Sequence, residues 1–228
     1  MSVKENYQRL MEEIEKACLR VGRRLEEVRL LGAAKRQPVE KIREAYAAGL
    51  RLIGENYVQE AQKKRQALAD LEMTWHLIGP LQTNKAKHAV QIFDLVETVD
   101  RPSIVRELGK RARQHELQLP VLIEVNVGGE ESKAGVAPEE LEGLAELVLN
   151  EEGLELRGLM TIPPYREDPE AVRPFFARLR RLLESLQARF PEAPLAELSM
   201  GMSHDFPVAV EEGATIVRVG TALFGPRR

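Results

Sequence analysis

The stretch VRLLGAAKRQPVEKI, residues 28–42, passes from an apolar run into a helical pattern, with Lys35 between the two. The run VRLLGAA has the length and composition of a buried strand. Pro38 stands where a helix would begin, and the apolar residues after it recur at three- and four-residue spacings. The stretch therefore predicts a strand, a turn and a helix, which is the repeating unit of α/β folds.

The same unit recurs along the whole chain. Apolar runs predict eight strands at 28–35, 51–55, 74–79, 95–99, 120–127, 154–162, 195–200 and 215–220. Helical periodicity predicts helices between them at 38–49, 57–71, 84–93, 102–117, 137–153, 168–190 and 203–213. Because parallel strands need right-handed crossovers and both faces of the sheet must be covered, we expect a (β/α)₈ TIM barrel rather than an open doubly wound sheet. No linker rich in Gly, Pro or Ser divides residues 1–228, so we expect a single domain.

The two ends of the chain predict one departure from a regular barrel. After the last predicted strand, TALFGPRR leaves no room for a full eighth helix, whereas residues 3–22 form an extra helical pattern before the first strand. We expect this N-terminal helix to cover the gap. Its predicted buried face consists of Tyr7, Leu10, Met11, Ile14, Ala17 and Leu19.

Composition argues against several classes of partner. The 228 residues carry 33 basic and 36 acidic side chains, a net charge of −3, and a nucleic-acid surface usually needs a basic excess. Cys18 is the single cysteine and no Cys/His cluster occurs, so we expect no metal site. The first twenty residues are charged throughout and no apolar run approaches the ~20 residues of a membrane span. We expect a soluble, cytoplasmic protein without nucleic-acid or membrane partners.

Polar residues gather at the predicted carboxyl ends of the strands, where barrels of this type carry their active sites. Lys35 is the most reactive of them. An amine at the end of an apolar strand lies in low-dielectric surroundings that favour the neutral, nucleophilic form needed for a Schiff base. The alternative is a salt bridge from Lys35 to a neighbouring carboxylate, and the spacing alone leaves both open.

The closing stretch SMGMSHDFPVAVEEGATIVRVGTALFG, residues 199–225, predicts an anion site. Two small-residue loops, at 199–203 and at Gly220 and Thr221, can present backbone N–H groups to a phosphate, although small residues also serve ordinary turns. Arg218 lies inside the last strand and needs a partner, either a bound anion, a ring nitrogen, or an ion pair with Glu55 or Asp205. An amine, a phosphate cup and an arginine together indicate pyridoxal phosphate (PLP).

A family resemblance follows from motifs that run in order along nearly the whole chain. They are GAAKRQP (32–38), IGENYVQE (53–60), WHLIGPLQTNK (75–85), EVNVGGEESKAG (124–135), GLMTI (158–162) and the closing stretch. These resemble the pyridoxal phosphate homeostasis proteins, which are similar to the N-terminal barrel of bacterial alanine racemase. The resemblance implies PLP as cofactor and Lys35 as its Schiff-base lysine. It further implies that the phosphate is held by Ser199, Gly220 and Thr221, that Arg218 faces the pyridine nitrogen, and that the pocket is lined by Asn56, His76 and Met160.

The resemblance also implies a role in binding, storing or delivering PLP and in amino- and keto-acid balance, without catalytic turnover. The chain ends at Arg228 without the second domain with which racemases complete their site, so we assign no catalytic residue and expect a monomer. Amino acids and apo-enzymes that receive the cofactor are the expected partners. A PLP-dependent racemase or lyase, with His76 or His204 as base, remains an alternative, and a class I aldolase-like barrel is a third. We expect the Gly-rich loop at 128–135 to serve either as a flap over the mouth or as a simple turn.

Overall fold

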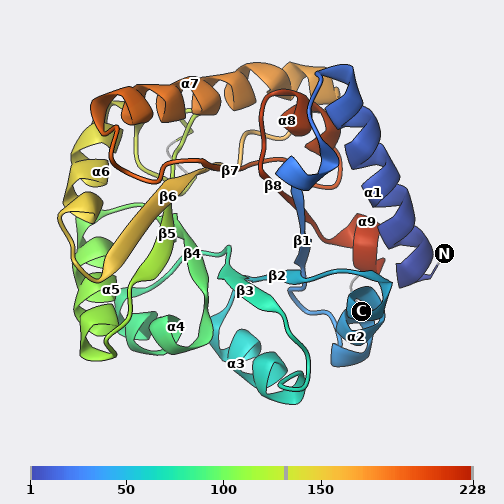
Figure 1. Cartoon of the computed structure of the whole chain (residues 1–228), viewed down its shortest axis with the longest axis horizontal. Helices are drawn as coiled ribbons and strands as arrows, with labels where there is room; N and C mark the ends of the chain where they lie inside the picture. The colour runs from blue at the N-terminus through green and yellow to red at the C-terminus, as the bar shows by residue number, and fades with distance from the viewer. Residues whose placement is uncertain (1, 131–132, 227–228) are drawn as a thin grey trace.

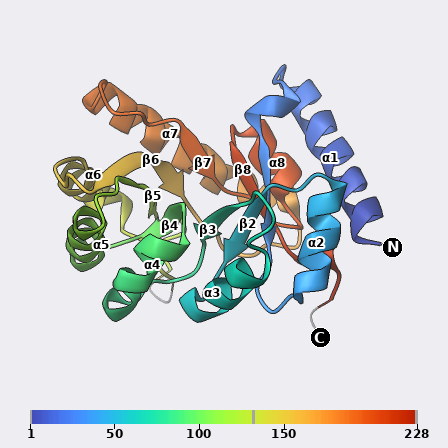
Figure 2. The same cartoon turned by 60° about the horizontal axis from the view of Figure 1, so that its bottom comes forward.

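The computed structural model describes residues 2–130 and 133–226 and shows a closed barrel of parallel strands surrounded by helices (Figures 1 and 2). The strands follow one another around the barrel in chain order. They are β1 (Arg29–Ala33), β2 (Leu52–Glu55), β3 (Thr74–Leu77), β4 (Leu95–Val99), β5 (Leu119–Glu124), β6 (Leu154–Met160), β7 (Glu197–Ser199) and β8 (Ile216–Val219). The predicted TIM barrel is confirmed.

Each predicted helix is present on the outside of the barrel. The crossover helices are α2 (Val39–Ala48), α3 (Val58–Ala67), α4 (Ala86–Ile92), α5 (Pro102–Gln114), α6 (Leu141–Leu149), α7 (Arg173–Arg189) and α8 (Phe206–Glu211). Single 3-10 turns stand apart at η1 (Leu25–Glu27) or lead into helices at η2 (Thr83–Lys85), η3 (Pro138–Glu140) and η4 (Pro169–Val172). Prolines begin η3 and η4 because a first-turn position needs no backbone N–H donor.

Several strands end earlier than the sequence predicted, and this changes the position of Lys35. The last paired residue of β1 is Ala33, opposite Gly54 of β2. Ala34 N–H still donates to Gly54 O, but the chain then turns, since Gln37 N–H donates back to Ala34 O. Lys35 therefore lies in the turn after the strand and not on the strand itself.

The N-terminal helix α1 (Val3–Arg20) fills the gap left by the short final helix α9 (Thr221–Phe224). It packs against α2, α8 and α9, and Asn6 donates a buried hydrogen bond to Leu223 O. The predicted face is correct except at its end, where Leu19 is 71% exposed and Cys18 is buried. The reason is helical geometry, because Ile14 and Cys18 are four residues apart and share one face.

Two apolar groups occupy parts of the barrel interior. One apolar group joins Leu31, Leu52, Ile78 and Ile216, and a second joins Leu95, Leu122 and Met160. Across the described residues, no helix combines the length and apolar character needed to cross a membrane.

Candidate functional site

Lys35 lies half-buried at the barrel mouth, in the turn between β1 and α2. Its Nζ is 5.0 Å from the centre of the Tyr57 ring, a cation–π contact with the first turn beyond β2. Within residues 2–130 and 133–226, the amine forms neither an ion pair nor a hydrogen bond. The alternative of a structural salt bridge to a carboxylate is thus not what the structure shows, and the amine is available to a ligand.

Asn56 follows β2 and lies beside Lys35's aromatic neighbour. With Tyr57 it lines a cavity of about 470 Å³ at the mouth. The cavity also involves Pro80, Leu81, Gln82, Lys85 and Arg101, which come from the loops after β3 and β4. Lys35 is not among the residues that line this cavity, and Asn56 and Lys35 follow the neighbouring strands β2 and β1.

A buried polar network crosses the inside of the barrel below this rim. Glu97 of β4 is its centre, with Oε1 2.7 Å from His76 Nδ1 and Oε2 accepting from Ser199 Oγ at 2.5 Å. Arg218 of β8 donates to Ser199 Oγ and to Thr161 O, both at 2.7 Å. The network thus joins strands on opposite sides of the barrel and holds the guanidinium in place.

The ionic partner of Arg218 differs from the sequence-based alternatives. Arg218 is 4% exposed and its nearest carboxylate oxygen is Glu97 Oε2 at 4.0 Å. Glu55 instead pairs with Lys64, and Asp205 accepts from the backbone N–H of Met202. Of the alternatives left open for Arg218, an ion pair with Glu55 or Asp205 is therefore not the one that the structure shows.

The charges of this network are balanced against its burial. Burial alone would raise the pKa of Glu97, but the hydrogen bond from His76, the charge of Arg218 and the Ser199 hydroxyl bring that pKa below its ordinary value. Burial lowers the pKa of Arg218, and Glu97, Glu124 and Asp205 oppose the shift. An ionised Glu97 has only acceptors, so His76 Nδ1 is the donor in their contact.

Glu124, at the end of β5, is the least compensated carboxyl group near Arg218. It is 5% exposed, and burial raises its pKa to about 7, with Asp100 adding to the shift and Arg218 opposing it. Among the described residues, its side chain has no hydrogen-bond or ion-pair partner. It can therefore offer either a proton or an acceptor to a ligand at neutral pH.

The loops after β7 and β8 present free backbone donors side by side. The backbone N–H of Arg218 in β8 donates to the carbonyl oxygen of Gly201, just after β7, at 3.0 Å. This hydrogen bond holds the end of β7 against β8. Beyond that point, no acceptor exists in the described part of the chain for four N–H groups, those of Ser203, His204, Thr221 and Ala222. Unpaired N–H groups in two loops that follow neighbouring strands are donors that can hold a phosphate.

The remaining predicted residues divide between rim and interior. Gly220 comes so close to β1 that a Cβ there would lie 3.2 Å from Ala33 O. Met160 is fully buried inside the barrel against Leu95 and Leu122. Ser199 is also fully buried, and both hydrogen bonds of its hydroxyl lie within the polar network. The structure thus brings Lys35, Asn56, Gly220 and Thr221 to the mouth, and His76, Ser199 and Arg218 to the layer below.

The predicted flap at 128–135 includes residues 131 and 132, which lie outside the described residues. Before them, Asn126 Oδ1 accepts from Gly129 N–H at 3.0 Å and its Nδ2 donates to Glu130 O at 2.8 Å. Asn126 therefore organises the start of its own loop.

Sequence reasoning missed two carboxylates of the site, Glu97 and Glu124. Both had a readable signal, since each interrupts an apolar strand, in LVETV (95–99) and in PVLIE (120–124). A charged residue inside such a run is buried only when something compensates it.

Comparison with known proteins agrees with the fold. The family model described as alanine racemase, N-terminal domain, matches residues 4–228. The chain is 53% identical over 228 residues to the pyridoxal phosphate homeostasis protein of Aquifex aeolicus, covering 100% of both chains. It is 46% identical over 226 residues to the protein of the same name from Pseudomonas aeruginosa, covering 99% of this chain and 96% of that one.

Among solved structures, PipY of Synechococcus elongatus PCC7942 with PLP bound superposes with a TM-score of 0.82. The identity is 41%, over 87% of this chain and 93% of PipY. The closed barrel and the family model together define a barrel of the alanine racemase N-terminal-domain class. More narrowly, this chain belongs to the family of pyridoxal phosphate homeostasis proteins.

Proposed function

We propose that this protein binds PLP at the barrel mouth through a Schiff base on Lys35. The observation that carries the proposal is the free Lys35 amine, which shares the mouth with the unsatisfied N–H groups after β7 and β8. The Lys35 nitrogen adds to an aldehyde carbon, a C=N bond forms and water leaves. The PLP bound to PipY supports the proposal for this chain.

The phosphate would be held by the backbone of the two last loops. Ser203, His204, Thr221 and Ala222 supply the donors, and Gly220 allows the close approach to β1. The Ser199 hydroxyl already donates its one proton to Glu97 and accepts from Arg218, so that proton is not free for a phosphate. We propose that Ser199 fixes Arg218 and does not contact the phosphate.

Arg218 would face the pyridine nitrogen. Two of its N–H groups are used by Ser199 and Thr161, and the guanidinium has five, so donors remain for a ligand. PLP supplies an electron sink when its ring nitrogen is protonated, and a permanently charged arginine beside that nitrogen disfavours protonation. The site therefore favours holding the cofactor over fast turnover, with His76 and Asn56 shaping the pocket.

The resulting cellular role is storage and delivery of PLP, which supports the balance of amino and keto acids. Transfer to a PLP-dependent apo-enzyme tests this role. The loaded protein should restore activity to the apo-enzyme faster than the same total concentration of PLP trapped by an unrelated binding protein. Light scattering by the loaded protein before it is mixed with the apo-enzyme would measure its mass and check the expected monomer.

Absorbance and chemical trapping test the Schiff base directly. The purified protein should show a visible absorption band with PLP, and borohydride should fix the cofactor on the peptide that contains Lys35. Lys35→Ala should lose the band, whereas Lys87→Ala, a variant of an exposed lysine on α4, should keep it. A Lys35→Ala protein with an unchanged band would refute the assignment.

The rival function is a PLP-dependent racemase or lyase, and Tyr57 is the aromatic residue in contact with Lys35. Exchange of the α-proton of added amino acids in deuterium oxide separates the two. Rapid, stereospecific exchange would favour the enzyme, and absence of exchange by a fully loaded protein would favour the holder. A visible band in the absence of any substrate would exclude the class I aldolase alternative.

A further inference from the structure

The turn that carries Lys35 is held from below by a cluster of three charged side chains, Glu55, Glu60 and Lys64. Lys64 Nζ donates to Ala34 O, to Glu55 Oε1 and to Glu60 Oε1, each at 2.7 Å. Its three protons are thus all used. Lys64 is therefore saturated, in contrast to Lys35, and is not a second candidate for the Schiff base.

The cluster fixes both peptide groups that flank Lys35. The Ala34 carbonyl, on one side, accepts from Lys64 Nζ as well as from Gln37 N–H at 2.9 Å. On the other side, the Arg36 N–H donates to Glu60 Oε1 at 2.6 Å. With both peptide planes held, the direction in which the Cα–Cβ bond of Lys35 leaves the backbone is fixed before any ligand arrives.

The backbone at this turn would not adopt this shape without support. Arg36 has a φ of +58°, a left-handed conformation that usually falls to glycine or asparagine. The Glu60 carboxylate binds the N–H of this same residue. The strained backbone conformation and the hydrogen bond that holds it thus both belong to Arg36, the residue next to Lys35. Strained residues of this kind cluster at functional sites.

The cluster is poorly designed for stability alone. Glu55 is fully buried, its Oε2 has no hydrogen-bond partner in the described structure, and burial raises its pKa to about 7. A buried ion pair of this kind is often replaceable by apolar residues without loss of stability. Its position under the Lys35 turn gives a reason for the charged residues.

We propose that Glu60 and Lys64, with Glu55, are positioning residues that preorganise Lys35 for attack on an aldehyde. The inference rests on the proposed function and adds residues that touch neither the aldehyde nor the phosphate. Loss of the anchor should leave the fold intact while making Lys35 slower to react and the cofactor easier to lose.

A matched pair of variants at Glu60 tests the proposal. Glu60→Ala and Glu60→Gln both remove the charge of a side chain that is 24% exposed, but only glutamine can still accept the Arg36 N–H. We expect Glu60→Ala to bind PLP about tenfold more weakly and more slowly, the effect of losing the acceptor for the Arg36 N–H, with Glu60→Gln close to the wild-type protein. In cofactor-free protein, the Arg36 amide should exchange its hydrogen faster in Glu60→Ala only.

The second test removes the buried charges. Lys64→Met alone leaves Glu55 unpaired and can fail to fold, so it is combined with Glu55→Gln in a double variant. Lys63→Met, on the exposed side of α3, is the control. The double variant should keep the wild-type melting temperature and still lose rate and affinity for PLP. Wild-type binding by both Glu60→Ala and the double variant, or equal weakening by Glu60→Gln and Glu60→Ala, would overturn the proposal.

Failure of the proposed function gives a different result. In that case borohydride would label no Lys35 in the wild-type protein, while amide exchange at Arg36 would still decide whether the cluster holds the turn. Unchanged Arg36 exchange in Glu60→Ala would refute the positioning role by itself.

Discussion

Two charged networks occupy contrasting parts of this barrel. The inner network joins Glu97, His76, Ser199 and Arg218, all at most 4% exposed, and it crosses between strands. The outer network surrounds Arg173, whose side chain is 31% exposed, and it joins helices. Both contain arginine–glutamate pairs, and their surroundings give these pairs opposite consequences.

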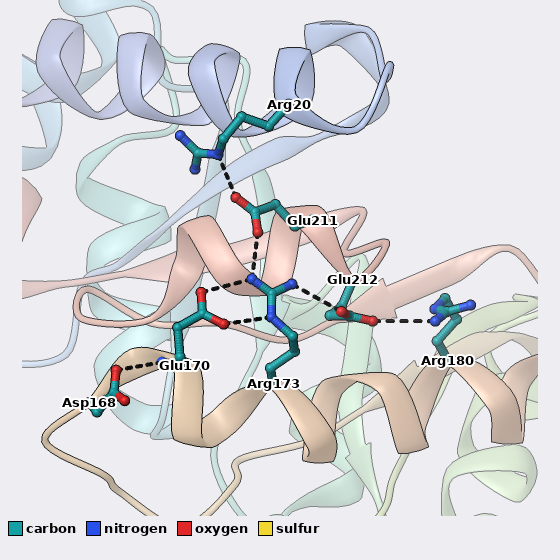
Figure 3. Close-up of polar contacts among 7 residues, drawn as sticks. All are labelled: Arg20, Asp168, Glu170, Arg173, Arg180, Glu211 and Glu212. Atoms are coloured by element: carbon teal, nitrogen blue, oxygen red, sulfur yellow. Dashed lines mark hydrogen bonds and ion pairs between the residues drawn. The ribbon is translucent and has the colours of Figure 1, made fainter.

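The outer network ties α1, α7 and α8 together on the surface (Figure 3). Arg173 contacts three carboxylates, those of Glu170 at 2.7 Å, Glu211 at 2.6 Å and Glu212 at 3.0 Å. Arg20 of α1 also donates to Glu211, at 2.5 Å. Hydrogen bonds with Glu170 and Glu211 raise the pKa of Arg173, so this guanidinium stays charged at any working pH.

The comparison shows what burial does to an ion pair. Outside, water solvates each group before and after folding, so every contact adds a small stabilisation. Inside, each charge has lost its water, and the network is favourable only while every partner remains. The inner network is therefore expected to be intolerant of single changes, and its charged residues are better explained by the ligand they serve than by stability.

The largest expected effect is the removal of the inner arginine. Arg218→Met leaves Glu97 buried without its cation, and we expect a loss of about 3–5 kcal/mol of unfolding free energy. Urea denaturation followed by circular dichroism measures it. The double variant Arg218→Met with Glu97→Gln removes both charges and should regain most of the loss while still binding PLP weakly. If the single variant loses no more than an exposed pair would, the inner network is not coupled as described.

The next effect is a pH dependence from Glu124. Burial raises the pKa of this carboxyl to about 7, so its contribution to stability is fully present below its ordinary pKa and is lost as pH rises through 7. Glu124→Gln cannot ionise. Relative to the wild-type protein, we expect it to gain about 1–3 kcal/mol between pH 5 and pH 8.

Paired urea titrations at pH 5, 6, 7 and 8 measure this gain. Glu55 has a raised pKa as well, but it is present in both proteins, so the difference between them isolates Glu124. A difference that does not change with pH would show that Glu124 is ionised throughout or is not buried in solution.

The fold could be predicted from sequence because its signals are local. Each apolar run and each helical period is a property of neighbouring residues, and the covalent order of strand and helix fixes a right-handed barrel. Lys35 was found for the same reason, since it directly follows such a run. The strand ends were placed too late because pairing stops where the neighbour stops, and this depends on residues far away in sequence.

The inner part of the site could not be predicted because its partners are brought together only by closure of the barrel. Glu97 and Ser199 are 102 residues apart and are hydrogen-bonded. Nothing in the spacing of Arg218 selects Glu97 over Glu55 or Asp205, the two carboxylates that the sequence offered as alternative partners. The hydrogen bonds of the Ser199 hydroxyl could not be predicted for the same reason, because they join β7 to Glu97 of β4 across the barrel and to Arg218 of the neighbouring β8.

The smallest expected effect concerns the outer network and its sensitivity to salt. Arg173→Ala should lose about 1–2 kcal/mol at low ionic strength, because several partly exposed contacts are removed together. At 1 M salt the Debye length falls to about 3 Å, and the loss should shrink by about half. Arg173→Lys keeps the charge but not the planar fork of the guanidinium, so its stability should fall between those of Arg173→Ala and the wild-type protein.

Arg24→Ala, which breaks a highly exposed pair with Glu27, is the matched control and should be indistinguishable from the wild-type protein. The inner variant Arg218→Met should respond little to salt in the same titrations, because its charges are shielded by protein and not by ions. Equal salt dependence of the two arginine variants would remove the distinction between the networks.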